Sequence, residues 1–306
     1  MKKTRYFFAL ATLFLAFSCA KERGGYVEQT TTGNNVRYLK TPNPFYRLSK
    51  VDAFLSSDPG KYIDIYSPSD YSISLSASRS TPIDKPVYGY SQGLNHNIVV
   101  TGTRGFVPDV MPYTVTFDGA NLDKSVTRAE TTNDYSALFG KDVTLSLKRA
   151  ATRSSETGAG NELAQGGLTA SLYIPQEIEI LLPAITGKDG LYPLCYYDGF
   201  VMQWNADPHN LNGIIVVVEW MGTMMFGYDH PEMYMRKTVH IADDNGTATL
   251  EASVFDDIPD TALCHLTIAR GAIENKLVDD EYSVKIMAES HVSLPFILIR
   301  NICDKQ

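Results

Sequence analysis

Apolar and polar residues alternate along much of this 306-residue chain. The alternation is clearest in Tyr71–Ser76, Tyr113–Phe117, Asp142–Lys148, Phe200–Trp204 and Tyr282–Glu289. A period of two places successive side chains on opposite faces of a strand, and one polar face indicates a half-buried strand. The pattern therefore predicts an all-β protein built from antiparallel sheets.

The second half of the chain contains the strongest strand signals. Ile214–Trp220 is apolar at every even position and carries Glu219 at an odd one, which predicts a central strand with one fully buried face. Asn245-Gly246 is a tight-turn pair, so Val239–Thr249 is expected to form a β-hairpin. The other expected elements are strands at Leu172–Leu182, Leu263–Ala269 and Phe296–Ile302, and a helix at Tyr46–Ser57.

Residues 150–167 interrupt the alternation with small and polar side chains, a composition typical of linkers. A long loop inside one domain would have the same composition, so both organisations stay open. The expected parts are a signal peptide at 1–18, a lipidated cysteine and polar tether at 19–40, an N-terminal β domain at 41–150, a linker or long loop at 151–167 and a C-terminal β-sandwich at 168–306.

The first residues have the order of a secretory signal. A basic head with Lys2, Lys3 and Arg5 precedes the apolar run Tyr6–Phe17 and the small residue Ser18. The apolar run is shorter than the roughly 20 residues that cross a bilayer as a helix. It is therefore expected to direct export, and Cys19 follows at the point of cleavage.

The sequence Leu15-Ala16-Phe17-Ser18-Cys19 resembles the lipobox of bacterial lipoproteins, in the looser form typical of the Bacteroidetes. The resemblance implies a diacylglyceryl group and further acylation on Cys19. Attachment through more than one acyl chain is stable, so the chain is expected to be anchored at the outer membrane, on its surface or periplasmic side. An ordinary cleaved signal peptide is the alternative.

The strand pattern from Leu168 to Cys303 resembles the immunoglobulin-like and fibronectin type III-like modules of Bacteroidetes surface lipoproteins. Seven or eight short strands with turn signals between them are typical of a Greek-key sandwich. We expect two β-sandwich domains, and the resemblance implies that the C-terminal one is immunoglobulin-like or fibronectin type III-like.

Charge and cysteine content exclude some functions. The net charge of −8 disfavours nucleic acid as a partner. If Cys19 carries lipid, Cys195, Cys264 and Cys303 remain, and they allow at most one disulfide whose pairing the sequence leaves open.

The chain shows no motif of a nucleophilic hydrolase, a phosphate-binding loop or a helical zinc site. His209 and His230 lie beside acidic residues in expected loops and are interpreted as solvated. Acidic pairs are interpreted as turn residues rather than calcium ligands; they occur at Asp243-Asp244, Asp256-Asp257 and Asp279-Asp280. No catalytic residue, metal or cofactor is therefore assigned, and we expect a protein that is not an enzyme.

Aromatic residues near expected turns are the best candidates for ligand contact. They are Tyr88, Tyr90, Tyr196, Tyr197 and Tyr228, and the alternative is that they close the ends of a sandwich. Trp204 and Trp220 stand on apolar strand faces and are expected in the core. Asp260-Thr261-Ala262 resembles the O-glycosylation motif of the Bacteroidetes, which implies a glycan on Thr261.

These observations favour a lipid-anchored binding or adhesion module with a glycan or protein ligand. The alternative is a structural or accessory subunit of a surface assembly, similar to the fimbrillins, with Arg128 or Arg149 as processing sites. A glycan-processing hydrolase is a third hypothesis, which would need two acids facing each other across a cleft.

Overall fold

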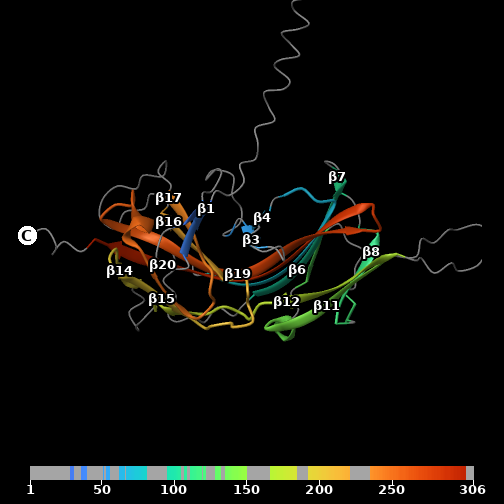
Figure 1. The fold of residues 1–306 in the computed structure, drawn as a ribbon, viewed down its shortest axis with the longest axis horizontal. Helices are drawn as coiled ribbons and strands as arrows, with labels where there is room; N and C mark the ends of the chain where they lie inside the picture. Colours follow the sequence, from blue (N-terminus) through green and yellow to red (C-terminus); the bar gives the residue numbers. More distant parts are fainter. Residues whose placement is uncertain are drawn as a thin grey trace, which may run out of the picture.

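The structure is a computed structural model, and it confirms a mostly β protein arranged as several sheets (Figure 1). It describes residues 28–30, 36–39, 51, 53–55, 62–65, 67–80, 95–104, 107–108, 111–118, 120–121, 128–131, 135–149, 166–184, 192–220 and 235–300. Helical structure within these ranges is limited to two short 3-10 turns, η2 (Ser136–Leu138) and η3 (Ala252–Phe255). None of the described residues belongs to a helix with the length and hydropathy to span a membrane.

One large sheet runs along the molecule. Its main order is β1-β2-β17-β16-β19-β20-β5-β6-β10, and β14 and β7 pair with β20 and β6 beside this path. The strands are β1 (Glu28–Thr30), β2 (Val36–Leu39), β5 (Tyr71–Ser80), β6 (Asn95–Arg104), β7 (Val107–Pro108), β10 (Arg128–Thr131), β14 (Leu194–Tyr196), β16 (Ile214–Trp220), β17 (Met235–Ile241), β19 (Thr261–Val278) and β20 (Tyr282–Ile299).

Two smaller sheets face the large one. The sheet β12-β11-β8-β9 lies against one half of it, and the sheet β13-β15-β18 lies against the other. A separate two-stranded hairpin joins β3 to β4. The strands are β3 (Ala53–Leu55), β4 (Tyr62–Asp64), β8 (Tyr113–Phe117), β9 (Ala120–Asn121), β11 (Lys141–Arg149), β12 (Gly167–Ile174), β13 (Ile180–Leu182), β15 (Phe200–Trp204) and β18 (Thr247–Leu250).

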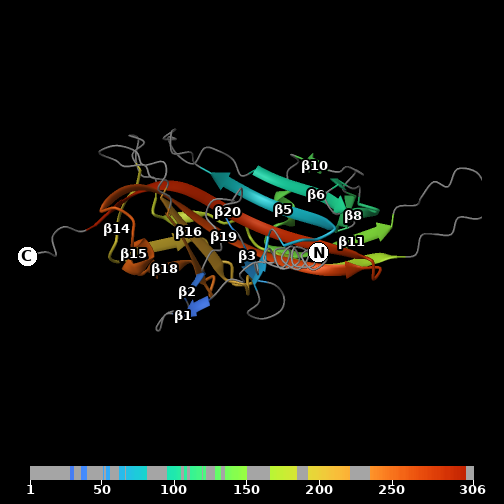
Figure 2. The same cartoon turned by 90° about the horizontal axis from the view of Figure 1, so that it is seen from above.

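The β19–β20 hairpin connects both halves of the molecule. Its two strands have 18 residues each and pair without interruption from Thr261–Ile299 to Val278–Tyr282. Figure 2 shows these strands crossing most of the long axis. One part of the hairpin is flanked by β16 and β14, and the other part by β5.

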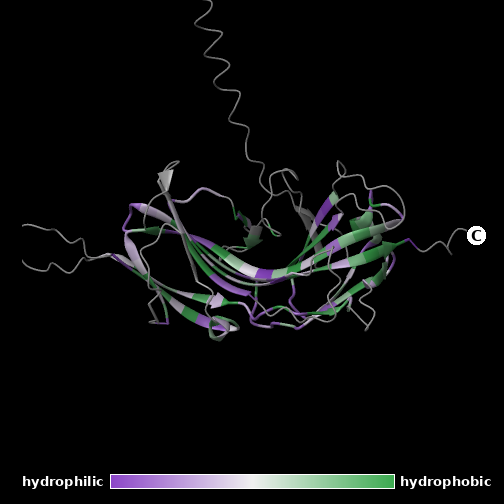
Figure 3. Ribbon diagram, turned by 180° about the vertical axis from the view of Figure 1, so that it is seen from behind, coloured by the Kyte–Doolittle hydropathy of each residue, from purple (hydrophilic) through white to green (hydrophobic). Residues whose placement is uncertain are grey.

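Apolar side chains form a separate core in each half. The β15-side core lies between the sheet of β15 and the large sheet and contains Trp204, Leu266 and Phe296. The β11-side core lies between the sheet of β11 and the large sheet and contains Leu145 and Ile286. Figure 3 shows apolar strand segments in both halves, with more hydrophilic segments in the middle of the long strands.

A buried polar pair separates the two cores within the hairpin. Along the inner face of β19, Ile268 belongs to the β15-side core and Ala272 to the β11-side core. Arg270 stands between them, opposite Ser290 of β20, and both residues are 0% exposed. The inner face therefore changes from apolar to polar and back within four residues.

The outer face of the large sheet carries a third apolar cluster, beneath the β3–β4 hairpin. Ile215 and Val217 of β16 pack there with Phe54 of β3. All seven residues of β16 are buried, which confirms the predicted central strand. A Cβ on Gly271 would lie 2.8 Å from the Phe54 ring and 2.7 Å from the Ala288 carbonyl oxygen, so only glycine permits this close approach.

Most expected strands are present, but two of them are longer than predicted. The runs at 282–290 and 296–302, expected as two strands, are joined in β20, although Pro295 lies between them and cannot donate a ladder hydrogen bond. Ile297 donates its N–H to Pro193 O, and amides two residues apart point to the same side, so the Pro295 nitrogen also faces that side. Pairing of β20 with β5 ends at Ser293, and pairing with β14 begins at Ile297. Pro295 faces the gap between these two strands, so its missing N–H removes no ladder hydrogen bond.

Other local predictions are wrong. β17 and β18, expected to form a hairpin around Asn245-Gly246, lie in different sheets, because β17 pairs with β16 and β18 pairs with β15. Ala53–Leu55, expected in a helix, is strand β3. The expected strand Leu172–Leu182 is divided into β12 and β13. The large sheet is mixed rather than antiparallel, since β5 and β14 both run parallel to β20.

Strands from both sides of the expected 151–167 boundary are paired with one another. β12 pairs with β11, and β20 pairs with β5. Residues 151–165 themselves lie outside the described ranges. Strands from 41–150 and from 168–306 therefore share sheets, whereas two separate domains would each have sheets of their own.

Because one hairpin enters both cores, we predict a single cooperative unfolding transition. Leu145→Ala in one core and Leu294→Ala in the other remove fully buried side chains, and each should cost about 2–5 kcal/mol. Calorimetry should show the same single transition moving in both variants. Leu211→Ala, at a residue that is 89% exposed, is the control and should leave it in place. Two transitions that respond separately would contradict this prediction.

Candidate functional site

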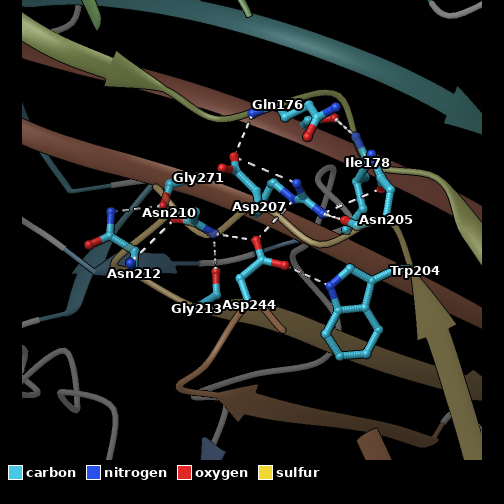
Figure 4. A network of polar contacts seen from close by, with 12 residues as sticks. Gln176, Ile178, Trp204, Asn205, Asp207, Asn210, Asn212, Gly213, Asp244 and Gly271 are labelled. Atoms are coloured by element: carbon cyan, nitrogen blue, oxygen red, sulfur yellow. Dashed lines mark hydrogen bonds and ion pairs between the residues drawn. The ribbon is translucent and has the colours of Figure 1, made fainter. Parts of the chain in front are cut away.

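The buried Arg270 is the centre of a polar network between the two cores. Figure 4 shows residues of this network, among them Asp207, Asn205 and Asp244. Arg270 Nε lies 3.2 Å from Asp244 Oδ2, and its Nη1 lies 3.6 Å from Asp207 Oδ2. Its Nη2 donates to the main-chain oxygen of Asn205. The side chains of both aspartates are almost fully buried, so one guanidinium is shared by two carboxylates away from water.

Asp207 connects this network to the sheet of β11. Its Oδ1 accepts hydrogen bonds from the Tyr173 hydroxyl at 2.8 Å and from His209 N–H at 3.2 Å. Its Oδ2 accepts from Gln176 N–H at 2.8 Å. Burial and the hydrogen bond to Asp207 raise the pKa of Tyr173, which therefore stays a donor at neutral pH.

Asp244 connects the network to the sheet of β15. Trp204 Nε1 donates to its Oδ1 at 2.7 Å, and Asn210 Nδ2 donates to its Oδ2 at 2.9 Å. Asp243-Asp244 lies in the connection between β17 and β18, in agreement with the turn interpretation, but Asp244 is only 6% exposed and also has partners in this network. Trp204 lies in the β15-side core as expected.

Desolvation and charge pairing act against each other here. Burial raises the pKa of Asp244, while Arg270 and the two side-chain hydrogen bonds lower it. Burial likewise lowers the pKa of Arg270, and Asp244 and Asp207 raise it. The pairing is what makes these charged groups tolerable in the interior.

The segment 175–179, which joins β12 to β13, is fixed by its main chain. Asn205 Oδ1 accepts a hydrogen bond from Glu179 N–H at 2.7 Å, and Asn205 Nδ2 donates one to Glu177 O at 2.7 Å. Ile178 N–H donates to Ser290 Oγ at 2.8 Å. With the bond from Gln176 N–H to Asp207, these contacts hold the segment against the polar centre of the hairpin.

This segment forms one wall of a cavity of about 410 Å³. Residues 176–179 and Asn205 line it together with Arg79 of β5, Ser136 of η2 and Phe139. Arg79 follows Ala77 on the inner side of β5, and Ala77 pairs with Ser290. The cavity therefore belongs to the same polar layer between the two cores; we call it the junction cavity.

One histidine reaches a glutamate of the cavity wall. His96 Nε2 lies 2.5 Å from Glu177 Oε1. The His96 ring also lies 5.5 Å from the ring of Phe139. One residue of β6 therefore contacts both a carboxylate and an aromatic ring of the cavity lining.

The aromatic residues proposed from the sequence do not line this cavity in the described part of the chain. Tyr196 is 51% exposed on β14 and remains available for contact. Tyr197 is only 3% exposed, because its ring packs on Phe255 and its hydroxyl donates to Ile258 O and Pro259 O, so the ligand-contact interpretation is wrong for this residue. Tyr88, Tyr90 and Tyr228 lie outside the described residues.

The modification sites are placed only in part. Cys19 and Cys303 lie outside the described residues. Thr261 is the half-buried first residue of β19, and its glycan stays a prediction. Cys195 and Cys264 are free thiols; burial raises the pKa of Cys195 to about 12 and also raises that of Cys264, so both are protonated at neutral pH.

No group of three metal-binding side chains lies close together within the described ranges. Asp279 and Asp280 occupy the hairpin turn with positive φ angles, in agreement with a turn role. The sequence matches no protein-family model, and no curated protein matches it in a sequence search.

The sequence contains a signal for Arg270 that the strand pattern alone did not use. The even positions of β19 from Ala262 to Ile268 are apolar and buried, so the next even position is expected to face inward as well. An arginine there predicts a buried charge that requires acidic partners. The identity of these partners depends on loops that meet only in the fold.

We predict that Arg270→Met is strongly destabilising at neutral pH, because it leaves two buried carboxylates without their cation. The expected loss in unfolding free energy is about 3–5 kcal/mol. The free energy should be measured by urea denaturation at pH 7 and pH 5. Arg149→Met, which removes a partly exposed arginine near Asp279 and Glu281, is the matched control and should cost less than about 1 kcal/mol.

The loss should become smaller at pH 5. Burial raises the folded-state pKa of Asp244 above its unfolded value of about 3.9, and without Arg270 only its hydrogen bonds are left to lower it. The stability linked to such a carboxyl is fully present below the unfolded pKa and is lost as the pH rises through the folded one. A loss that is equal at both pH values would contradict this account of the network.

Proposed function

We propose that this chain is a lipid-anchored protein of the cell envelope that acts as a non-catalytic binding module. The lipobox-like sequence ending at Cys19 supports the anchor and a location at the outer membrane, on its surface or periplasmic side. The observation that carries the binding function is the junction cavity, whose wall is fixed by main-chain hydrogen bonds independently of any ligand. Pockets at the interface between two structural units are common ligand sites.

Binding is favoured over hydrolysis by the position of the acidic side chains. Glu177 and Glu179 both line the cavity, but they come from one segment of its wall. A glycosidase needs two carboxyl groups on opposite sides of the scissile bond. We therefore infer that the cavity holds a ligand without cleaving it.

The proposal includes the relationship of the C-terminal strands to immunoglobulin-like or fibronectin type III-like sandwiches. Two facing sheets around Trp204 and Trp220 are compatible with that relationship. The sharing of β19 and β20 with the other half of the molecule is a departure from an isolated module.

We predict that Cys19→Ala releases the protein from the membrane fraction, because the acyl chains are its only expected anchor. Fractionation of cells expressing each form measures this, and protease added to intact cells reports which side of the membrane the protein faces. Cys195→Ala is the control, since its thiol is half-buried in the fold, and should remain membrane-bound. A Cys19→Ala protein that stays in the membrane would contradict the anchor.

A second candidate is an accessory subunit of a surface assembly, similar to the fimbrillins. Leu194 and Tyr196 of β14 are 60% and 51% exposed, and β14 pairs only with β20 among the described strands. Exposed apolar side chains on a short edge strand are suited to contact with another protein. Arg149, one of the expected processing sites, is the last residue of β11.

The intact mass of the native protein distinguishes these candidates. An anchored binding module should retain a lipidated N-terminus, whereas an assembly subunit should lack its N-terminal part up to Arg128 or Arg149.

The same measurement tests the modification of Thr261: we predict added sugar in the wild type that Thr261→Ala removes. Thr247→Ala, at another strand residue outside the glycosylation-like motif, is the control. A wild-type mass without sugar would contradict the modification.

A further inference from the structure

We propose that the junction cavity binds a neutral, hydroxyl-rich ligand, namely a single sugar residue or the end of a glycan chain. This inference rests on the binding function proposed above and specifies the ligand class. The volume of the junction cavity, about 410 Å³, is within the range of small-molecule sites and would accommodate one or two sugar rings.

The cavity offers hydrogen-bond donors and acceptors in similar measure. Arg79 contributes guanidinium donors, and Glu177 and Glu179 contribute carboxylate acceptors. The Gln176 amide and the Ser136 hydroxyl can each both donate and accept. Sugar hydroxyls also donate and accept together, so this mixture suits them better than it suits a ligand with only one kind of group.

The lining side chains carry charges of both signs. Arg79 contributes one guanidinium, Glu177 and Glu179 contribute two carboxylates, and Glu177 is also in contact with His96. An anion would meet the two carboxylates, and a cation would meet Arg79. The charge distribution therefore favours a neutral polar ligand over a phosphate or a free amine.

The lining also contains apolar surface. Phe139 and Ile178 line the cavity beside the polar side chains. A pyranose ring has C–H faces as well as hydroxyl edges, and aromatic side chains pack against such faces. An entirely polar lining would leave the C–H groups without contacts.

The wall is fixed before any ligand binds. The main-chain N–H groups of Gln176, Ile178 and Glu179 all donate hydrogen bonds within the protein, to Asp207, Ser290 and Asn205 respectively. Binding therefore requires ordering of the Gln176 and Glu179 side chains but not of the main chain. Such preorganisation lowers the entropic cost of binding.

The test uses the full-length protein purified from membranes in a detergent without a sugar headgroup. Saturation-transfer difference NMR is recorded with glucose, galactose, mannose and N-acetylglucosamine as neutral probes, and with lysine and glutamate as charged probes. Titration of each probe that gives a signal yields its dissociation constant.

Two variants locate the binding. Gln176→Ala and Glu179→Ala each remove one exposed polar side chain from the wall, and each should raise the dissociation constant of a neutral sugar about tenfold. Glu251→Ala removes an exposed glutamate that does not line the cavity and should leave the constant unchanged. A thermal unfolding midpoint equal to that of the wild type establishes that each variant is folded.

The outcomes separate this inference from the proposed function. A neutral sugar that binds the wild type and Glu251→Ala, but binds both cavity variants more weakly, supports the inference. Sugar binding that is equal in all four proteins overturns it, because the sugar then binds elsewhere. Cavity-dependent binding of lysine or glutamate alone overturns the ligand class and leaves the binding function standing. If no probe gives a signal that the cavity variants weaken, both the ligand class and the binding function of the cavity are overturned.

Discussion

The buried ion cluster of Arg270 with Asp207 and Asp244 is the interaction on which the rest of the structure depends. The inner face of the hairpin is apolar from Ala262 to Ala272 on β19 and from Val284 to Leu298 on β20, with Arg270 and Ser290 as the exceptions. The polar pair divides that face, so apolar side chains gather into two cores rather than one. It also requires partners, which the loops after β12, β15 and β17 supply.

Such an arrangement gains specificity more than stability. Removing charged groups from water costs several kcal/mol, and good pairing only roughly offsets this cost. In return, every partner has a fixed place. Asp207 and Asn205 hold the β12–β13 connection, and Asp244 joins the loop before β18 to Trp204. The junction cavity is a consequence, since a layer of polar residues that face one another across the two halves does not close as tightly as an apolar core.

The sequence was sufficient to predict strands but not their partners. Alternation identified β5, β8, β11, β15 and β16, because each places one apolar face on a core. It could not predict that β5 lies beside β20, since the two strands come from opposite ends of the chain and their parallel pairing has no local signal. The sequence also did not predict that β20 continues through Pro295. A proline is tolerated there because it faces the gap between β5 and β14, which only the fold shows.

The site was predicted least well, for a related reason. Asp207, Asn205 and Glu177 stand in segments whose sequence is that of ordinary loops, and their roles arise only where those loops meet Arg270. Turn chemistry predicted the positions of both Asp279 and Asp244 between strands, but not the burial of Asp244. The difference is that Asp244 lies beside an inward-facing arginine, which local sequence does not reveal.

The most direct test of this account is native-state hydrogen exchange of the β19–β20 hairpin. If one hairpin organises both halves, the β19 amides that bond to β20 on both sides of Arg270 should exchange only through global unfolding. Their exchange free energies should therefore be equal, and should equal the unfolding free energy from urea denaturation. Exchange of the 272–278 amides at a distinctly lower free energy than the 262–268 amides would contradict the account, because the two halves would then open separately.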